Sequence, residues 1–304
     1  MAAVSAVRIG APLAWAVATI VVVAGFGVPT SRELVLAWVL AGMLAFSASN
    51  LRRRLPRLIV DWAPFVALLL VYDLLRGFAD GLLFPAHELP QIRLENALFG
   101  TPAPTVWLQS HLWHGAADLR WWDFAAWLVY VSHFLVTPIA AAVLWTFAHD
   151  RFRRYAYMVC GLTVAGFLTY VLYPAVPPWM AAQNGNLGES NRIVPIVWGH
   201  VPVAHFDALF DHGVRYANDV AAMPSLHAGY AMLFALFFWS LTPWWGKPVI
   251  ALYPLAMAFA LVYTGEHYVV DCVAGWIYAI VTFVVVNAIF DRRCAPSARQ
   301  LMAD

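Results

Sequence analysis

The stretch His267–Phe290, HYVVDCVAGWIYAIVTFVVVNAIF, decides the fold, because a histidine and an aspartate stand at the head of a long apolar run. From Val269 this run is long enough to cross a bilayer as a helix, which takes roughly 20 mostly apolar residues. We therefore expect an all-α integral membrane protein of about six to eight transmembrane helices, the first of them a retained span and not a cleaved signal. The seven similar runs that precede this one lie near residues 11–28, 33–50, 58–75, 124–147, 156–176, 225–242 and 248–265.

The composition indicates that lipid surrounds most of the chain. Of 304 residues, 62% are hydrophobic and 12% are charged, whereas soluble domains carry about 25% charged residues. The net charge is +1 and there is no basic tract, which argues against a nucleic-acid partner. The three cysteines, Cys160, Cys272 and Cys294, form no C-x-x-C pair, and we assign them no chemistry.

Two longer connections, at about 76–123 and 177–223, are rich in Pro, Gly, Asn, Asp and His. We expect three parts along the chain. They are N-terminal transmembrane helices and an outer loop at 1–123, a catalytic membrane core at 124–290, and a cytoplasmic tail at 291–304.

The basic residues predict the orientation, since cytoplasmic loops carry an excess of Lys and Arg. With eight spans, twelve of the 18 basic residues fall on one side of the membrane. Both termini are therefore expected in the cytoplasm and both long connections outside, with the active site on the non-cytoplasmic face of the plasma membrane. The twelve are Arg8, Arg52, Arg53, Arg54, Arg57, Arg151, Arg153, Arg154, Lys247, Arg292, Arg293 and Arg299.

Two motifs share the outer side in this topology. One is Ala222–His227 at the head of the sixth span, and the other is Gly265–Asp271 between the seventh and the eighth. His267 and Asp271 are four residues apart, so on a helix they share a face and the carboxylate can accept the proton of one imidazole nitrogen. The other nitrogen is then a nucleophile, and His227 is free to act as the acid.

The residues before His227 predict an anion site. Pro224 suits a first helical turn, where free backbone N–H groups and the positive end of the helix dipole can hold a phosphate. Ser225 could add a hydroxyl donor there.

Other interpretations compete with a catalytic one. A His–Asp pair can be structural, although an intramembrane aspartate is a functional hypothesis by default. His227, His267 and Asp271 could also be three metal ligands, and His111 and His114 form an H-x-x-H pair. We expect neither a metal nor a cofactor. A transporter or a lipid-binding membrane protein with a structural His–Asp pair would show broken helices in two repeats, and we find no such repeat.

At these residues the sequence resembles the type 2 phosphatidic acid phosphatase superfamily, and within it the inositol phosphorylceramide synthase-like branch. The resemblance covers about residues 120–290 and rests on Tyr173–Trp179, Asn218–His227 and His267–Trp276. Softer matches lie at Tyr72–Gly77, Pro104–Gln109 and Ser132–Phe134.

This resemblance implies that His267 attacks phosphorus to form a phosphohistidine, that Asp271 orients it, and that His227 protonates the leaving group and then activates the acceptor. The superfamily's phosphatases carry a Ser-Arg pair before the nucleophile, and Ala260 and Leu261 stand at those positions here. The difference favours transfer of a phospho-head group, phosphoinositol among the candidates, from a phospholipid donor to a lipid or alcohol acceptor. A lipid phosphate phosphatase is the alternative.

Phosphate-binding cations must then come from elsewhere. Arg76 is our candidate, because it ends the third span on the outer side and could neutralise a phosphoryl oxygen. Anchoring at the interface, with Asp73 or Asp80 as its partner, is the alternative. Arg192 and Arg215 are weaker candidates.

Three aromatic or imidazole side chains complete the expected site. We expect Tyr268 and Trp179 to contribute to substrate binding, with Trp179 at the entrance for the head group. His133, deep in the fourth span, is expected to pack or to support the site from behind.

Cysteine labelling tests the predicted orientation. A cysteine at Gly188, in a chain without the three native cysteines, is expected to react with a membrane-impermeant maleimide on intact cells, because the second long connection is predicted to be external. Labelling only after lysis would invert the orientation and move the site to the cytoplasm.

Overall fold

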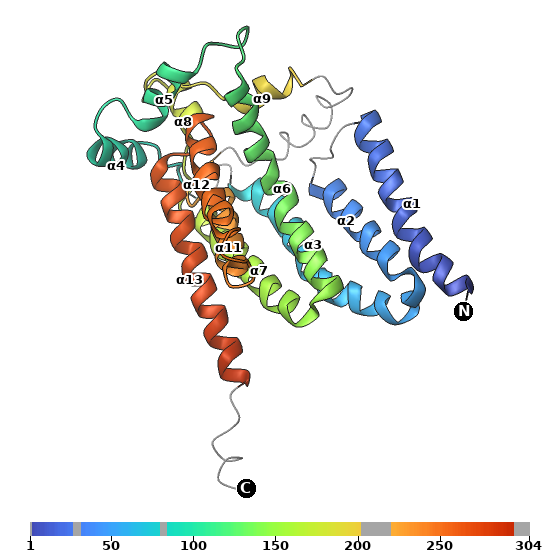
Figure 1. Cartoon of the computed structure of the whole chain (residues 1–304). Coiled ribbons are helices and arrows are strands. Elements are labelled where there is room, and N and C mark those ends of the chain that lie inside the picture. The colour runs from blue at the N-terminus through green and yellow to red at the C-terminus, as the bar shows by residue number, and fades with distance from the viewer. Residues whose placement is uncertain (1, 27–31, 80–83, 202–219, 295–304) are drawn as a thin grey trace, which may run out of the picture.

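The computed structural model describes residues 2–26, 32–79, 84–201 and 220–294 as a bundle of main helices with shorter helices gathered at one end (Figure 1). Each main helix coincides with one of the eight predicted apolar runs. The described ranges contain no strand, so the predicted all-α fold class is confirmed. The main helices are α1 (Ala2–Phe26), α2 (Arg32–Ser47), α3 (Leu51–Ala79), α6 (Trp121–Phe147), α7 (His149–Leu172), α11 (Leu226–Trp239), α12 (Lys247–Tyr263) and α13 (Val269–Cys294).

Five stretches of the described chain are long and apolar enough to cross a membrane. The helices α11 and α12 are also apolar but have only 14 and 17 residues. At 1.5 Å per residue they measure about 21 and 26 Å, less than the hydrocarbon core of about 30 Å. These are the helices of an integral membrane protein. The five long stretches are Val7–Gly25, Leu34–Leu68, Trp121–Phe147, His149–Leu172 and Val269–Arg292.

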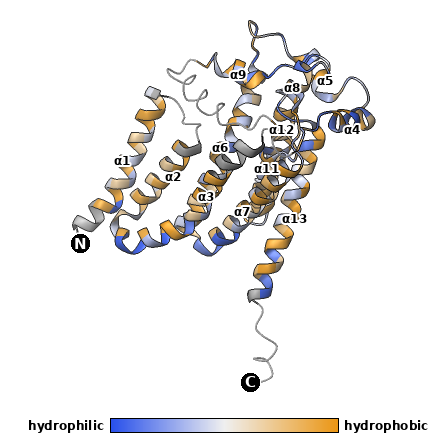
Figure 2. Cartoon of the chain, turned by 180° about the vertical axis from the view of Figure 1, so that it is seen from behind, coloured by the Kyte–Doolittle hydropathy of each residue, from blue (hydrophilic) through white to orange (hydrophobic). Residues whose placement is uncertain are grey.

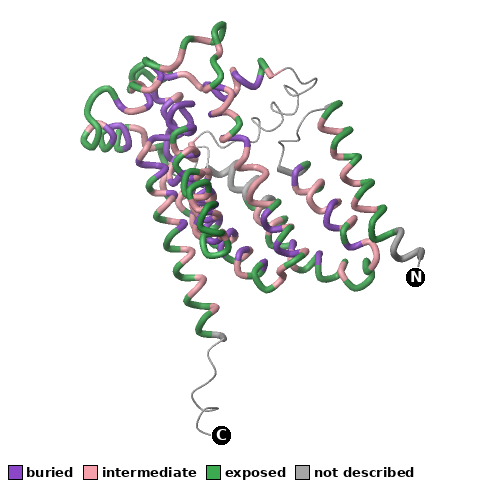
Figure 3. Tube along the Cα trace, in the orientation of Figure 1, coloured by how far each residue is buried: buried purple, intermediate pink, exposed green. Residues whose placement is uncertain are grey.

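The helices α6 and α7 stand between two groups of helices (Figure 1). On one side α2 packs on α6 and α3 packs on α7, and on the other side α12 packs on α6 and α13 packs on α7. The bundle exposes large apolar side chains, among them Ile20, Val60 and Val249, and hydrophobic residues run along the helices in Figure 2. Buried positions gather between the helices and beneath the shorter ones (Figure 3). The exposed apolar faces suit contact with lipid.

One end of the bundle is basic. The α2–α3 junction, the α6–α7 junction and the end of α13 all lie at this end, away from the short helices (Figures 1 and 2). Arg154 joins two of these segments, because its guanidinium donates to Asn287 Oδ1 at 3.1 Å and to Asp291 Oδ1 at 3.0 Å. The basic clusters near these junctions therefore share one side of the protein.

In the part of the chain that the structure describes, four short helices form a cap over the other end. The sequence predicted only connections here, because helices this short are not stable alone and depend on the surfaces they pack against. Gln109 joins the cap to the bundle, since its Nε2 donates to the carbonyls of Asn191 (2.9 Å) and Tyr263 (2.8 Å). The cap helices are α4 (Leu89–Phe99), α5 (Pro104–Leu112), α8 (Pro178–Gln183) and α9 (Ile193–Trp198).

The starts of α11 and α13 meet backbone to backbone. The amide of Ser225 donates to the carbonyl of Asp271 at 2.9 Å. Gly275 lies so close that a Cβ there would be 2.1 Å from the Ser225 carbonyl oxygen, and a Cβ on Gly229 would be 3.1 Å from the Gly275 carbonyl oxygen. Small residues permit this approach between membrane helices, and the approach brings the two sequence motifs together.

Gly275→Ala is expected to lower the stability of the protein by about 1–3 kcal/mol or more, because a backbone oxygen cannot turn away from an added methyl group. The measurement is the thermal unfolding midpoint in detergent. Gly161→Ala is the matched control on α7, since its Cβ would meet only a side-chain atom, Thr282 Cγ2, at 3.3 Å. Equal midpoints for the two variants would contradict the role given to Gly275.

Candidate active site

Two histidines meet where α11 and α13 begin. His227 lies in the first turn of α11, and His267 lies two residues before α13. The Nε2 atom of His267 is 3.4 Å from the Nδ1 atom of His227. His267 is buried, whereas His227 is only half-buried. The structure thus brings the two predicted histidines together, one enclosed and one partly open.

The other nitrogen of His267 is held by a backbone carbonyl. Nδ1 lies 2.8 Å from the carbonyl oxygen of Ala222. A carbonyl can only accept, so Nδ1 carries the proton, and Nε2 of the neutral imidazole keeps a free lone pair. This lone pair faces His227, as a nucleophile paired with an acid requires.

Asp271 is farther from His267 than the sequence predicted. Its Oδ2 is 3.8 Å from Nδ1 of His267 and accepts the backbone N–H of Tyr268 at 2.9 Å. The four-residue spacing does not place the two side chains on one helical face, because α13 begins only at Val269. The fully buried carboxylate still lies on the Nδ1 side of the imidazole.

A backbone clamp fixes the position of the Ala222 carbonyl. The amide of Ala222 donates to the carbonyl of Ala175 at 3.1 Å, and the amide of Ala175 donates to the carbonyl of Val220 at 2.7 Å. The amide of Val176 in turn donates to the carbonyl of His87 at 2.9 Å. The Tyr173–Trp179 motif of the sequence therefore holds the segment that leads into His227.

Aromatic and imidazole rings surround His227. Tyr130 of α6 stacks on it with ring centroids 5.1 Å apart, and His133 lies 4.3 Å away between ring centroids. Phe134 meets the same ring edge to face at 6.1 Å. His133 of α6 thus packs directly against His227 of α11, the predicted acid.

Ser225 caps α11. It is fully buried, and its Oγ accepts the N–H of Ala228 at 3.3 Å. The helix begins at Leu226, so Pro224 lies before the cap and not in the first helical turn as the sequence predicted. Contact of Ser225 with a phosphate remains a prediction.

The three-ligand metal interpretation does not fit the geometry. His227 lies on the Nε2 side of the His267 ring and Asp271 lies on the Nδ1 side, so the three side chains form a row and do not surround one point. Among the residues that the structure describes, no group of three or more His, Cys, Asp or Glu side chains could hold a metal ion. His111 and His114 are exposed, and each places its Nδ1 near a backbone carbonyl of its own segment.

Arg192 already forms an ion pair within the protein. Its guanidinium donates to both carboxylate oxygens of Glu266, at 2.9 and 3.2 Å, and lies 4.7 Å from the ring centroid of Trp179. Trp179 therefore packs on the arginine that is paired with Glu266, the residue before His267. Arg76 lies in α3, but its side chain is outside the described part, and Arg215 falls in the undescribed range 202–219.

Tyr268 and Glu95, a residue that the sequence analysis missed, are both buried near the start of α13. Tyr268 is fully buried and packs in one cluster with Ile92 of α4, so its predicted contact with substrate remains a prediction. Glu95 of α4 is fully buried too, and its Oε1 accepts the N–H of Val270 at 2.8 Å. Burial raises the pKa of the Glu95 carboxyl from 4.5 to about 7, and the nearby Asp271 raises it further against the effect of the Val270 hydrogen bond.

Comparisons with known proteins agree with this geometry. The family model described as PAP2 superfamily matches residues 99–285. A phosphoinositol dihydroceramide synthase of Bacteroides thetaiotaomicron is 28% identical over 242 residues, which are 72% of this chain and 73% of that protein. No solved structure matches.

Two fungal proteins are also similar. The catalytic subunit of inositol phosphorylceramide synthase from Schizosaccharomyces pombe is 30% identical over 203 residues, 63% of this chain and 44% of that protein. The corresponding subunit from Saccharomyces cerevisiae is 27% identical over 166 residues, 53% of this chain and 41% of that protein. This chain therefore matches less than half the length of either fungal subunit.

The pKa of Glu95 predicts a pH dependence of stability. Between pH 4.5 and about 7 the carboxyl is protonated in the folded protein and ionised in the unfolded chain, so its contribution to stability falls as the pH rises and is constant above pH 7. Glu95→Gln should remove this part of the dependence of stability on pH. We expect the difference in thermal midpoint, wild type minus Glu95→Gln, to decrease across this window.

Glu189→Gln, at an exposed glutamate of the 184–190 segment, is the matched control and should keep the wild-type slope. An unchanged slope in the Glu95→Gln variant would show that this carboxyl does not titrate in the window.

Proposed function

This chain belongs to the PAP2 superfamily, and we propose that it transfers a phosphorylated head group from a phospholipid donor to a hydroxyl group of a lipid acceptor. The observation that carries the proposal is the pair formed by Nε2 of His267 and Nδ1 of His227, 3.4 Å apart, with the opposite nitrogen of His267 held by a carbonyl. Phosphoinositol is the first head group to test, and ceramide or dihydroceramide the first acceptor, because the similar proteins are named as synthases of such lipids.

The first half of the reaction forms a covalent intermediate. Nε2 of His267 attacks the phosphorus of the donor, and the bond between phosphorus and the glycerol oxygen breaks. His227 gives its proton to that oxygen, so diacylglycerol leaves as a neutral alcohol. The head group stays on His267 as a phosphohistidine.

The second half returns the enzyme to its starting state. Neutral His227 takes the proton of the acceptor hydroxyl, whose oxygen attacks phosphorus while the bond to Nε2 breaks. The Ala222 carbonyl and the Asp271 carboxylate both lie on the Nδ1 side of His267, so they stabilise the positive charge that the ring carries while it is phosphorylated.

The histidines must separate before the chemistry begins. An in-line displacement places the leaving oxygen on the side of phosphorus opposite the attacking nitrogen. A gap of 3.4 Å between Nε2 of His267 and Nδ1 of His227 is a direct contact and leaves no room for a phosphoryl group. We assign this movement to His227, because it is the more exposed of the two.

Charge favours transfer of a diester head group over hydrolysis of a phosphomonoester. A monoester dianion needs several cationic donors, and the positions of the superfamily's Ser-Arg pair hold Ala260 and Leu261, which are buried in the core. Arg192, next to the site, is paired with Glu266. A phosphodiester carries a single charge, which Arg76 and the start of α11 could balance.

Orientation completes the proposal. We place the cap and the histidines on the non-cytoplasmic face, in the plasma membrane, because the helix junctions that carry the basic clusters lie at the opposite end of the bundle (Figures 1 and 2).

Purified protein with phosphatidylinositol labelled in its inositol phosphate, and with ceramide added, tests this function. The wild type should convert donor and acceptor into inositol phosphorylceramide and diacylglycerol in equal amounts. His267→Ala should abolish turnover, and His227→Ala should slow it by about 10²–10⁴-fold, the usual contribution of general acid–base catalysis. Acid-labile label should be found on the wild-type protein and not on His267→Ala.

His111→Ala is the matched control, because this histidine is exposed on the cap, and it should turn over normally. Near-normal turnover of His267→Ala would refute the nucleophile. Fast phosphate release from phosphatidic acid, with no acceptor product, would instead place the chain among lipid phosphate phosphatases.

A further inference from the structure

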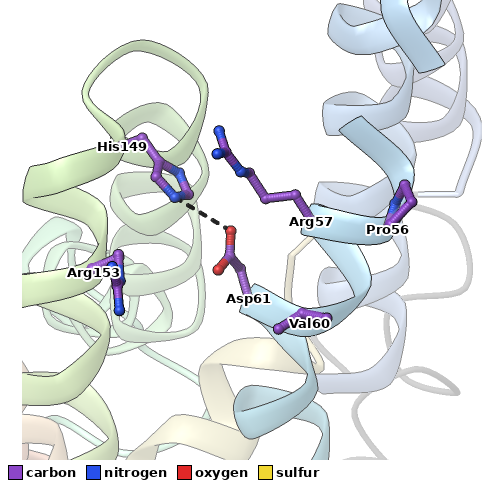
Figure 4. A pocket seen from close by; sticks show the side chains of 6 residues that line it. All are labelled: Pro56, Arg57, Val60, Asp61, His149 and Arg153. Atoms are coloured by element: carbon purple, nitrogen blue, oxygen red, sulfur yellow. Dashed lines mark ion pairs between the residues drawn. The ribbon is translucent and has the colours of Figure 1, made fainter. Parts of the chain in front are cut away.

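A pocket lined by charged side chains lies at the basic end of the bundle, and Figure 4 shows it from close by. It has a volume of about 420 Å³ and opens between the beginning of α3 and the beginning of α7. Nothing in the proposed transfer reaction uses it. Its walls are formed by Pro56, Arg57, Val60, Asp61, His149 and Arg153.

The pocket has an excess of positive charge. Arg57 comes from α3 and Arg153 from α7, and within residues 2–26, 32–79, 84–201 and 220–294 neither guanidinium forms an ion pair. The carboxylate of Asp61 is held by its neighbours, because its Oδ2 accepts Trp145 Nε1–H at 2.9 Å and lies 3.6 Å from Nε2 of His149. Figure 4 shows the His149 ring directed toward Asp61, the Arg57 side chain extending from α3 across the pocket, and Arg153 on the α7 side with His149. The lining therefore holds two guanidinium groups and only one carboxylate, which already has partners.

The surroundings of the pocket distinguish a lipid from a free anion. The lining residues of α3 belong to the candidate span Leu34–Leu68, and those of α7 begin the candidate span His149–Leu172. Ile59 and Val60, beside Arg57, are 62% and 70% exposed. A ligand here thus meets cations at the beginning of α3 and of α7 and, next to them, apolar surface that continues along α3. A phosphate group attached to acyl chains fits both features.

We propose that this pocket binds the phosphate group of an anionic phospholipid from the leaflet opposite the catalytic histidines. Basic pockets between membrane helices on the positive side of a protein bind such head groups, and arginine is suited to a phosphate because its planar guanidinium donates two parallel hydrogen bonds. The bound lipid joins α3 to α7. It therefore holds the N-terminal helices α1–α3 against the helices that carry the active site.

The test compares two double variants of equal charge in detergent. Arg57→Gln/Arg153→Gln removes the pocket cations, and Arg52→Gln/Arg151→Gln removes two exposed arginines from the same segments that do not line it. The probes are phosphatidylglycerol, phosphatidylcholine and inorganic phosphate, and the readouts are lipid adducts in native mass spectrometry and the thermal midpoint.

Phosphatidylglycerol is expected to bind and to raise the midpoint of the wild type and of the Arg52/Arg151 variant, and phosphatidylcholine to do neither. The pocket variant should bind phosphatidylglycerol at least about tenfold more weakly, because both charged contacts to the phosphate are removed. Arg57→Lys/Arg153→Lys keeps the charge and should recover part of the binding, which also covers the case in which the Gln variant folds poorly.

Equal loss of binding in the two Gln variants would overturn the proposal, because it would indicate diffuse attraction to the basic surface. A midpoint shift that inorganic phosphate reproduces at equal concentration would overturn the assignment to a lipid. The readouts are binding and stability, so either result leaves the proposed transfer reaction untouched.

Discussion

The hydrogen bond from Nδ1 of His267 to the carbonyl of Ala222 is the interaction on which the site depends. It fixes the tautomer of the imidazole with a group that has no titratable state. The carbonyl is held by the clamp through Ala175, and the segment that follows it is held by the hydroxyl of Tyr170, which donates to the carbonyl of Pro224 at 2.8 Å. The packing of α11 on α13 and the Tyr173–Trp179 motif together fix the position of the Ala222 carbonyl oxygen.

The main helices could be predicted from the sequence because membrane helices satisfy their backbone hydrogen bonds internally. Each apolar run therefore carries its own structural information, and all eight runs correspond to helices. The cap could not be predicted in this way. Its helices have 6–11 residues and depend on contacts with distant segments, such as the hydrogen bonds of Gln109 to Asn191 and Tyr263.

The side chains of the candidate site could be proposed from the sequence, whereas the backbone groups that hold them could not. His227 and His267 are histidines in apolar stretches of the sequence, and the order of the spans predicts that both lie at the same depth on the outer side of the membrane. The Ala222 carbonyl leaves no trace in the sequence, so the orienting role was assigned to Asp271 alone. Glu95 was missed because its partner, the N–H of Val270, is 175 residues away along the chain.

The short helices α11 and α12 set the depth of the reaction in the bilayer. The turn between them carries Trp244 and Trp245, which are 82% and 69% exposed, as tryptophans at the edge of the hydrocarbon layer are. From this turn to the histidines the two helices climb about 21–26 Å, within a layer of about 30 Å. In the proposed reaction the phosphate therefore lies just below the far surface of the hydrocarbon layer. Donor and acceptor can then diffuse in sideways with their tails still in the leaflet, and the diacylglycerol product never has to leave it.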